Sequence, residues 1–336
     1  MLKIKTPYLL FAADETQYFL IKTGLGLAQW AADKCVGQLR LHPDALGFEL
    51  NDYTIKEAVD AGAKSLVVGI APVGGRIPDA WIPVFLEAIE SGLDIVSGLH
   101  DKLNGIDALV SAATKCGTQL IDVRTPPEAL PCGTGAPRSG KRVLTVGTDC
   151  AIGKKYTSLA LAREFLNRGV DCDFRATGQT GIMISGSGIP IDAVISDFLS
   201  GAAETLSPAA DENHWDIIEG QGSLFHPSFA AVTLGLIHGS QPDAMILCHQ
   251  PTRRSIEGFN DYPLPTLPTA IETYVDAAKL TSKNTRVAGI CLNTHDMSED
   301  DALRAIDDIQ QSLGLPCVDP IRTGVGPLAD ALLGAS

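Results

Sequence analysis

A glycine-rich segment carries the residue types best suited to chemistry. It reads Gly147-Thr148-Asp149-Cys150-Ala151-Ile152-Gly153-Lys154-Lys155-Tyr156. An apolar run at 142–146 precedes it and a helical pattern at 157–167 follows it, which is the context of a phosphate-binding loop. Backbone N–H groups around Gly153, with the positive end of a helix behind them, would hold an anion, and Lys154 would add an ammonium group. We expect a phosphate site here; an ordinary strand–turn–helix with glycine for close packing is the alternative.

The same segment departs from the usual nucleotide-binding pattern at two points. Five residues rather than four separate Gly147 from the Gly153-Lys154 pair, and Lys155 stands where a serine or threonine normally holds Mg²⁺ against the nucleotide phosphates. Thr157 lies two positions further on, about 200° around a helix, so its hydroxyl cannot simply replace the missing one. A phosphorylated carrier is therefore at least as good a candidate ligand as a hydrolysed nucleotide.

A second candidate is a carboxylate at the end of another apolar run. The run WDII (215–218) leads into Glu219. Open parallel sheets bind ligands at the carboxyl ends of their strands, so we expect Glu219 to face a ligand; a helix-capping or solvated carboxylate is the alternative. The Gly-Gln-Gly turn that follows, with Gln221 at its centre, would allow a substrate to approach closely. His226 is near enough in sequence to take part in proton transfer, although a lone histidine more often has a structural role.

Polar side chains follow three further apolar runs. The polar residues are Arg175, Gln179 and Thr180 at the run 172–176, Arg253 after the run 244–248 and Asn293 after the run 286–292. The first group is rich in hydrogen-bond donors and would either bind a carboxylate or form a flexible turn. Arg253 would clamp a substrate carboxylate with two hydrogen bonds or remain a solvated surface residue. The Asn293 amide would read the edge of a base or simply form a turn.

The sequence gives little support for a metal site, a hydrolase nucleophile or a set of disulfides. The seven histidines show no metal-ligand spacing, and no G-x-S-x-G motif indicates a hydrolase nucleophile. The eight cysteines are scattered without a C-x-x-C pair, which predicts free thiols in a reducing compartment. We therefore expect no bound metal and no disulfide framework.

Short strands that alternate with helices must position these residues. The first part of the chain has helical patterns at 54–61 and 81–91 and strand-like runs at 65–70, 94–97 and 119–123. Further strand-like runs follow in the second part, at 142–146, 172–176, 215–219, 244–248 and 286–292. Such alternation predicts parallel sheets with helices on their faces.

The composition of one segment suggests where the chain divides. Residues 125–141 contain four prolines and three glycines, so neither a helical nor a strand period survives there. We expect an α/β protein with two domains: a Rossmann-like parallel sheet in residues 1–130, a linker at 131–141, and a doubly wound sheet like that of P-loop NTPases in residues 142–336.

Composition and charge restrict the class of partner. The 336 residues are 45% hydrophobic and 20% charged, so the chain can bury a core and is not a disordered protein. A net charge of −14 disfavours nucleic acid, but one local site can still bind a small anion. No stretch reaches 18 apolar residues, and the run at 8–13 is too short for a signal peptide or a membrane span. We expect a cytoplasmic enzyme with a small-molecule substrate and no membrane partner, which self-associates as enzymes of this size commonly do.

The motifs resemble those of known proteins. Gly147-Thr148-Asp149 with Gly153-Lys154, followed by Glu219-Gly220-Gln221-Gly222, is similar to the P-loop fold of dethiobiotin synthetase. A longer resemblance, to the D-glutamate N-acetyltransferases, a P-loop family long regarded as of unknown function, spans nearly the whole chain. Its segments are GIAPVGGRIPDAW (69–81), GTDCAIGKKYTSLAL (147–161), RATGQTGIMISGSGIPIDAVISDF (175–198), WDIIEGQGSLFHPSFA (215–230) and DPIRTGVGPLADALL (319–333).

The longer resemblance implies an activity and a set of roles. The activity is transfer of the acetyl group of acetyl-CoA to the amine of D-glutamate, or of a related D-amino acid, in D-amino-acid catabolism. A phosphate cradle without the Mg²⁺-binding hydroxyl suits the phosphates of CoA. Under this hypothesis Glu219 is the general base, with Asp149 and His226 as further candidates. The glycine-rich segment, from Gly147 to Tyr156 apart from Asp149, binds the cofactor together with Asn293. Residues on the substrate side are Arg175, Gln179, Thr180, Gln221 and Arg253.

Two other functions stay open from the sequence. The first is an ATP- and Mg²⁺-dependent ligase or kinase of the dethiobiotin synthetase kind, which Lys155 disfavours and Mg²⁺-dependent ATP consumption would support. The second is a non-catalytic sensor of a nucleotide or of CoA, which would bind its ligand and show no turnover with any D-amino acid.

Overall fold

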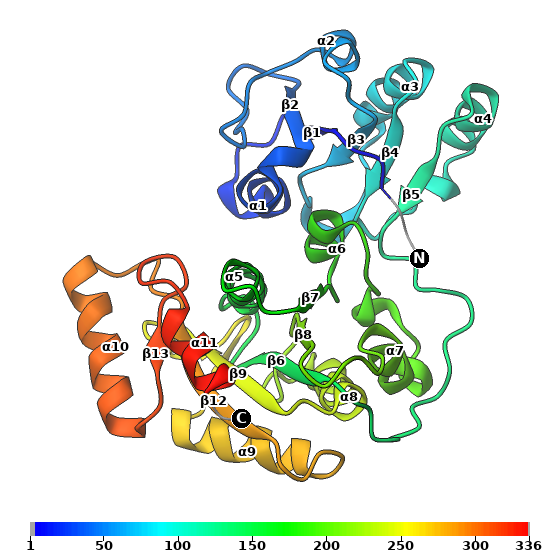
Figure 1. Ribbon diagram of the computed structural model, residues 1–336. Coiled ribbons are helices and arrows are strands. Elements are labelled where there is room, and N and C mark those ends of the chain that lie inside the picture. The colour runs from blue at the N-terminus through cyan, green and yellow to red at the C-terminus, as the bar shows by residue number, and fades with distance from the viewer. Residues whose placement is uncertain (1–3, 335–336) are drawn as a thin grey trace. The chain divides into compact units, whose positions relative to one another are not determined.

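The computed structural model describes residues 4–334, which form two compact α/β units (Figure 1). The first unit contains the chain up to Thr125 together with Gln179–Pro190, and the second contains Pro126–Gly178 together with the chain from Ile191 onward. Each unit is built on a parallel sheet, so the predicted fold class is confirmed. All eight cysteines are free, and within residues 4–334 no helix is long and apolar enough to span a bilayer.

The first unit has a five-stranded parallel sheet in the order β2-β1-β3-β4-β5. Its strands are β1 (Tyr8–Ala13), β2 (Cys35–Arg40), β3 (Ser65–Val68), β4 (Asp94–Ser97) and β5 (Leu120–Asp122). Its helices are α1 (Lys22–Trp30), α2 (Ile55–Asp60), α3 (Ile82–Glu90) and α4 (Asp107–Cys116). The three central strands are fully buried, as expected for apolar runs covered on both faces.

A short helix from the second half of the chain completes the first unit. This helix, α6 (Gln179–Ser185), packs against α1. The hydroxyls of Thr23 and Thr180 are 3.2 Å apart, and Tyr8 and Lys34 donate hydrogen bonds to backbone carbonyls of α6. Two residues predicted to bind substrate, Gln179 and Thr180, therefore belong to the first unit.

The second unit has a six-stranded parallel sheet in the order β13-β12-β9-β6-β8-β7. The strands are β6 (Lys141–Gly147), β7 (Cys172–Arg175), β8 (Trp215–Ile218), β9 (Ala244–His249), β12 (Arg286–Leu292) and β13 (Cys317–Val318). A small antiparallel hairpin joins β10 (Ser255–Ile256) and β11 (Phe259–Pro263). The strand order reverses at β6, and the carboxyl end of the strand at such a reversal is where open parallel sheets bind ligands.

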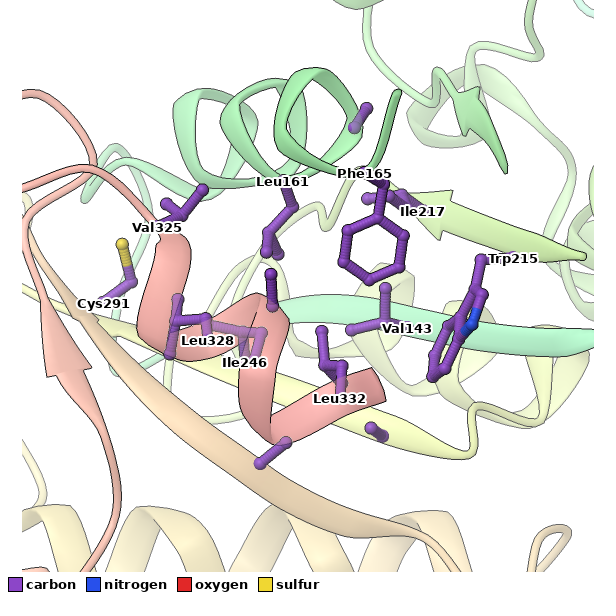
Figure 2. Packing of buried hydrophobic residues seen from close by; sticks show 14 of the residues in the cluster. Val143, Leu161, Phe165, Trp215, Ile217, Ile246, Cys291, Val325, Leu328 and Leu332 are labelled. Atoms are coloured by element: carbon purple, nitrogen blue, oxygen red, sulfur yellow. The ribbon is translucent and has the colours of Figure 1, made fainter. Parts of the chain in front are cut away.

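Helices cover the second sheet, and α5 follows directly on its glycine-rich loop. They are α5 (Lys154–Asn167), α7 (Leu199–Leu206), α8 (Ala230–Ser240), α9 (Leu267–Lys279), α10 (Glu299–Leu313) and α11 (Gly326–Leu333). Figure 2 shows Leu161 and Phe165 of α5 packed with Leu328 of α11 over the strands. The Phe165 ring meets Trp215 edge to face at 5.6 Å, and burial of one such ring stabilises by about 2–3 kcal/mol. This packing fixes α5, and therefore the loop that leads into it.

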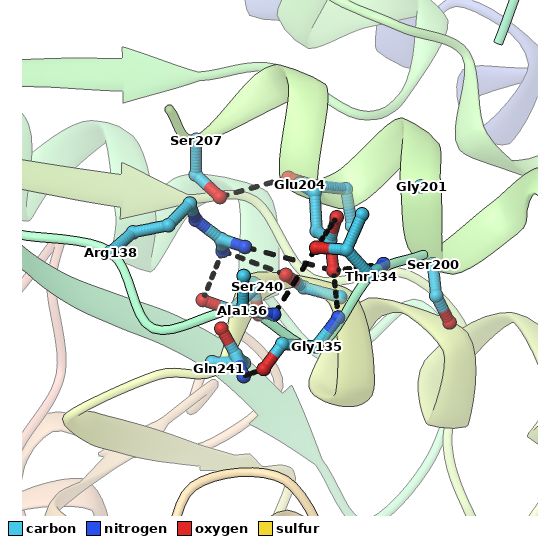
Figure 3. A network of polar contacts seen from close by, with 12 residues as sticks. Thr134, Gly135, Ala136, Arg138, Ser200, Gly201, Glu204, Ser207, Ser240 and Gln241 are labelled. Carbon is cyan, nitrogen blue, oxygen red and sulfur yellow. Dashed lines mark hydrogen bonds and ion pairs between the residues drawn. The ribbon is translucent and has the colours of Figure 1, made fainter. Parts of the chain in front are cut away.

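The predicted linker is held firmly on the second unit (Figure 3). It has no helix or strand before Lys141, as its proline and glycine content predicts. The Glu204 carboxylate accepts hydrogen bonds from the backbone N–H groups of Thr134 and Gly135 at 2.8 and 2.7 Å. Arg138 donates to two carbonyls at the end of α8, and Gln241 donates to the Gly135 carbonyl. The segment therefore forms part of the second unit's surface.

Candidate functional site

The glycine-rich loop between β6 and α5 has an unusual backbone. Gly153 has φ 105° and Ala151 has φ 53°, both in the left-handed region. This conformation is uncommon for alanine, and such positions are frequent at functional sites. A Cβ atom at Gly153 would lie 3.7 Å from the Asn293 Cβ, so the end of β12 lies beside the loop. Ile152 is buried in the core against Gly147, which leaves only its backbone for a ligand.

Lys154 points into the loop that precedes it. Its side chain is buried, and its Nζ donates a hydrogen bond to the Asp149 carbonyl at 2.8 Å. Burial lowers the pKa of this ammonium group. The Thr157 hydroxyl instead donates to the Gly153 carbonyl and lies 3.1 Å from the Cys291 Sγ, inside the core. The expectation that Thr157 cannot supply the missing hydroxyl is therefore correct.

An ion pair between Asp149 and Arg253 stabilises the glycine-rich loop. The Asp149 side chain is fully buried, and its Oδ2 accepts hydrogen bonds from Arg253 at 2.7 Å and from the Glu257 backbone N–H at 2.9 Å. Its Oδ1 accepts from the Cys150 N–H at 2.7 Å. Arg253 also donates to the Cys150 carbonyl. The pair joins the loop to the segment that carries the β10–β11 hairpin.

The Glu219 carboxylate lies beside the loop at the end of β8. It is buried, and its Oε2 accepts hydrogen bonds from the backbone N–H groups of Thr177 and Gly178 at 3.0 and 3.1 Å. Its Oε1 lies 3.5 Å from the position that a Cβ atom at Gly178 would take. Burial raises the pKa of Glu219, although the Thr177 hydrogen bond and the Lys155 charge oppose the rise. A carboxyl group with a raised pKa binds a proton more tightly than an exposed glutamate does.

Close packing places Glu219 against the glycine-rich loop. A Cβ atom at Gly220 would lie 1.7 Å from the Thr145 carbonyl oxygen and 3.2 Å from Cδ of Lys154. Only glycine fits between β6 and Lys154 at this point. The Gly220 N–H donates to the Thr145 hydroxyl at 2.9 Å, which fixes the turn. The two motifs that the sequence analysis singled out therefore meet in the second unit.

Three of the predicted site residues converge at the head of the loop. Side-chain atoms of Asp149, Cys150 and His226 lie within 4.8 Å of one another. Burial raises the pKa of the Cys150 thiol, so this thiol stays protonated at neutral pH. Because the Asp149 carboxylate is already neutralised by Arg253, the cluster suits a hydrogen-bonding role better than a cation site.

The hydrogen bonds of His226 fix which ring nitrogen carries the proton. The ring is buried, and its Nδ1 accepts a hydrogen bond from the Ser228 N–H at 3.1 Å. The neutral imidazole therefore has its proton on Nε2, which makes that nitrogen a donor. Phe229 and Phe259 pack on the ring at centroid distances of 4.5 and 5.3 Å.

The remaining predicted site residues occupy several places. The Arg175 side chain pairs with Asp216 at 2.5 Å and with Asp173 at 2.8 Å, while its backbone carbonyl accepts a hydrogen bond from the Glu219 N–H at 3.0 Å. The Gln221 amide donates to the Thr177 hydroxyl at 3.2 Å, close to Glu219. The Thr148 hydroxyl lies 2.9 Å from the His249 Nδ1 at the start of the loop. Lys155 and Tyr156 lie in the first turn of α5, with the ammonium 5.2 Å from the ring centroid.

Two further residues that hold the site together were not among the candidates taken from the sequence. The buried Tyr274 hydroxyl donates to the Gly147 carbonyl at 2.6 Å and accepts from the Leu224 N–H at 3.1 Å. Ser223 also donates to the Gly147 carbonyl, at 2.8 Å. These contacts join the end of β6 to the turn after Glu219. Tyr274 is distant in sequence and sits in an ordinary helical pattern, so only the fold reveals it.

Comparison with known proteins places this geometry in a family. Residues 131–329 match a P-loop domain and residues 43–126 a Rossmann-like domain, both described as domains of unknown function of the DUF1611 family. A DUF1611 family protein of known crystal structure from Anabaena variabilis is 35% identical, with a TM-score of 0.88 over 98% of this chain and 100% of its own.

Two curated relatives match over nearly their whole length. One from Pseudoalteromonas sp is 51% identical over 96% of this chain and 98% of its own, and one from Tritonibacter scottomollicae is 46% identical over 98% of this chain and 99% of its own. Both are named D-glutamate N-acetyltransferase. The resemblance noted in the sequence is thereby confirmed, and the chain belongs to the DUF1611 family, with its Rossmann-like domain followed by its P-loop domain.

Proposed function

We propose that this protein transfers the acetyl group of acetyl-CoA to the amine of D-glutamate or of a related D-amino acid, as a step in D-amino-acid catabolism. The names of the two relatives support the reaction and the acceptor. The observation that carries the proposal is the buried Glu219 carboxylate beside a phosphate-binding loop that lacks a Mg²⁺-binding hydroxyl.

The loop suits the phosphates of CoA. The ammonium of Lys154 and the backbone around Gly153 supply positive charge and N–H donors, and Lys155 adds a second cation at the start of α5. Asn293 lies beside Gly153, where its amide can contact the same ligand. We assign these residues, with the rest of the segment from Gly147 to Tyr156, to the donor.

Glu219 is the group best suited to accept a proton. The acceptor arrives as an ammonium ion and must lose a proton before its nitrogen can attack the thioester carbonyl. We assign that proton to the Glu219 Oε1, because Oε2 already accepts the hydrogen bonds of Thr177 and Gly178. Attack of the amine nitrogen on the thioester carbonyl forms the C–N bond and a tetrahedral intermediate. Breakdown of this intermediate breaks the C–S bond and releases the CoA thiolate. The second amine proton goes to this thiolate, so CoA leaves as the free thiol.

The other two candidate bases fit different roles. Both oxygens of Asp149 already accept hydrogen bonds, and one faces the Arg253 guanidinium, so Asp149 braces the loop. His226 in its neutral form offers Nε2–H, which suits stabilisation of the developing oxyanion. Arg175 and Arg253 both pair with carboxylates of the protein, so we assign them to the framework.

Product analysis tests the proposal. The purified protein, incubated with acetyl-CoA and D-glutamate, is expected to yield N-acetylglutamate by mass spectrometry, with one acetyl group added for each CoA released. Reactions without protein or without acetyl-CoA are the controls. Binding of acetyl-CoA without any acetylated product would support a sensor, and ATP consumption that depends on Mg²⁺ and a carboxylate would support a ligase.

Two broader expectations accompany this function. The net charge of −14 supports a small-molecule substrate rather than nucleic acid. We also propose a cytoplasmic enzyme that forms homo-oligomers, and light scattering of the purified protein measures the oligomeric state directly.

A further inference from the structure

Thr177 contacts Glu219 at two different groups. It lies two positions after the end of β7, and it is fully buried. Its backbone N–H donates to the Glu219 Oε2 at 3.0 Å, and its hydroxyl donates to the Glu219 backbone carbonyl at 2.7 Å. One residue therefore holds both the main chain and the carboxylate of Glu219.

Neighbouring residues of the second unit fix Thr177. The Gln221 amide donates to the Thr177 hydroxyl at 3.2 Å, which leaves the hydroxyl hydrogen for the Glu219 carbonyl. Glycine at position 178 makes room for this amide, because a Cβ atom there would lie 2.5 Å from the Gln221 Nε2. The Thr177 carbonyl accepts a hydrogen bond from the Ile191 N–H at 3.0 Å. Each polar group of Thr177 thus has a partner within the second unit.

The segment that contains Thr177 depends on these hydrogen bonds for its position. Residues 176–178 lie in no helix or strand. The chain leaves the second unit after Gly178 and returns to it at Ile191. Regular secondary structure therefore does not hold the two N–H groups that bind the Glu219 carboxylate, and the Thr177 hydroxyl supplies a direct link to β8 and the turn that follows it.

We propose that Thr177 is a positioning residue for Glu219 during acetyl transfer. This inference rests on the proposed function for the role of Glu219. A buried residue whose polar groups are all bonded to the protein acts through its neighbours and not by contact with substrate. A carboxylate that accepts two hydrogen bonds at Oε2 keeps a fixed orientation, so Oε1 also keeps a fixed direction. Such orientation of a reacting group is a large part of enzymatic rate enhancement.

Substitution of the Thr177 hydroxyl tests the inference. Thr177→Val keeps nearly the same shape without the hydroxyl, and we expect kcat with D-glutamate to fall about 10- to 100-fold, as for a displaced reacting group, while the Kd for acetyl-CoA is unchanged. Thr177→Ser keeps the hydroxyl and should restore most of kcat.

Thr285→Val is the matched control. The buried Thr285 hydroxyl also donates to a backbone carbonyl, that of Pro242 at 2.6 Å, but Thr285 precedes β12 and so lies at the opposite end of that strand from Asn293. This variant loses a comparable hydrogen bond, and its kcat should stay at the wild-type value.

The ionisation of Glu219 provides a measurement that needs no turnover. The Thr177 N–H bond opposes the effect of burial, which raises the pKa of Glu219. If this bond weakens in Thr177→Val, the pKa of Glu219 should rise further, as measured by carbon-13 NMR of labelled glutamate with Glu219→Gln to assign the signal. Lys155 lowers the same pKa and Asp192 raises it, and the variant leaves both charges in place.

The results separate this inference from the proposed function. Wild-type kcat and an unshifted Glu219 pKa in Thr177→Val overturn the role of Thr177 and leave the acetyltransferase standing. An equal fall of kcat in Thr177→Val and Thr285→Val also overturns that role. A shifted Glu219 pKa in a protein that never acetylates D-glutamate supports the positioning of Glu219 and rejects the proposed function. If Thr177→Val does not fold, Thr177→Ala replaces it, because alanine places no methyl group where the hydroxyl was.

Discussion

At the scale of single residues, two glutamates with the same kind of backbone partners differ in their surroundings. Glu219 and Glu204 each accept hydrogen bonds from two consecutive backbone N–H groups. Burial dominates at Glu219 and raises its pKa. At Glu204 burial is outweighed by the bonds from Thr134 and Gly135 and by the Arg138 charge, which hold its pKa below the usual value. We expect the first to act in the reaction and the second to stabilise the fold.

Glu219→Gln should therefore lose activity without losing stability. Removal of a general base typically costs 10²- to 10⁴-fold in rate, and we expect kcat for acetyl transfer to fall within that range while acetyl-CoA still binds. A raised carboxyl pKa contributes stability at low pH that is lost as pH rises through the folded-state pKa. At neutral pH the variant should melt at the wild-type temperature or above it, as measured by calorimetry.

Glu204→Gln is the matched control. A lowered carboxyl pKa contributes stability above the unfolded value, and this stability is lost as pH falls through the folded-state pKa. We expect the variant to be destabilised by about 1–2 kcal/mol at neutral pH, with kcat unchanged in the folded protein. Loss of turnover in Glu204→Gln equal to that in Glu219→Gln would remove the distinction between the two carboxylates.

The raised pKa of Glu219 also predicts a pH profile. Glu219 accepts a proton only when it is ionised, and burial moves its ionisation above the ordinary value of 4.5. As pH falls, kcat/KM for D-glutamate should decline at a higher pH than an exposed glutamate would produce. This acidic limb should be absent from the residual activity of Glu219→Gln and present in Glu204→Gln. An identical limb in Glu219→Gln would assign the proton transfer to another group.

At the scale of elements, the ion pair between Asp149 and Arg253 holds the phosphate-binding loop against the hairpin segment. Arg253→Met would leave the fully buried Asp149 carboxylate without its cation, and breaking such pairs costs about 3–5 kcal/mol. We expect chemical denaturation to show a loss of this size. The double variant Asp149→Asn with Arg253→Met should recover part of it, whereas strictly additive losses would show that the pair has no energetic coupling.

Local signals predicted most of these elements. The helical patterns at 54–61 and 81–91 correspond to α2 and α3, and the run at 94–97 coincides with β4. The apolar run at 8–13, too short for a membrane span, is β1 in the middle of the first sheet. Periodicity and turn residues act over a few positions, so they carry this information in the sequence itself.

Contacts between distant residues were not predictable in the same way. That α6 packs in the first unit depends on Thr23 meeting Thr180, 157 positions away. The fixation of the loop by Tyr274 and the pairing of Arg253 with Asp149 also depend on long-range packing. The sequence predicted that Glu219 follows a strand at its carboxyl end, and the structure has the next residue, Gly220, packed against Lys154. The sequence could not tell which arginines were already paired within the protein.

At the scale of the whole molecule, the two units carry complementary chemistry. The second unit presents the glycine-rich loop of a P-loop domain with a buried carboxylate beside it, and the first presents a small cavity with an arginine. Although the net charge is −14, the Lys154 and Lys155 ammonium groups stand together at the loop to which we assign the anionic donor. The two relatives match 96% and 98% of the chain, so the match extends over both units.

Release of free thiol from acetyl-CoA, with and without D-glutamate, tests this function most directly. The reaction contains EDTA and no ATP, because the loop lacks the hydroxyl that would hold Mg²⁺. We predict thiol release that depends on D-glutamate, is unaffected by EDTA and is lost in Glu219→Gln. No thiol release, together with ATP turnover once Mg²⁺ and a carboxylate are added, would contradict the acetyltransferase and show that the loop binds nucleotide despite Lys155.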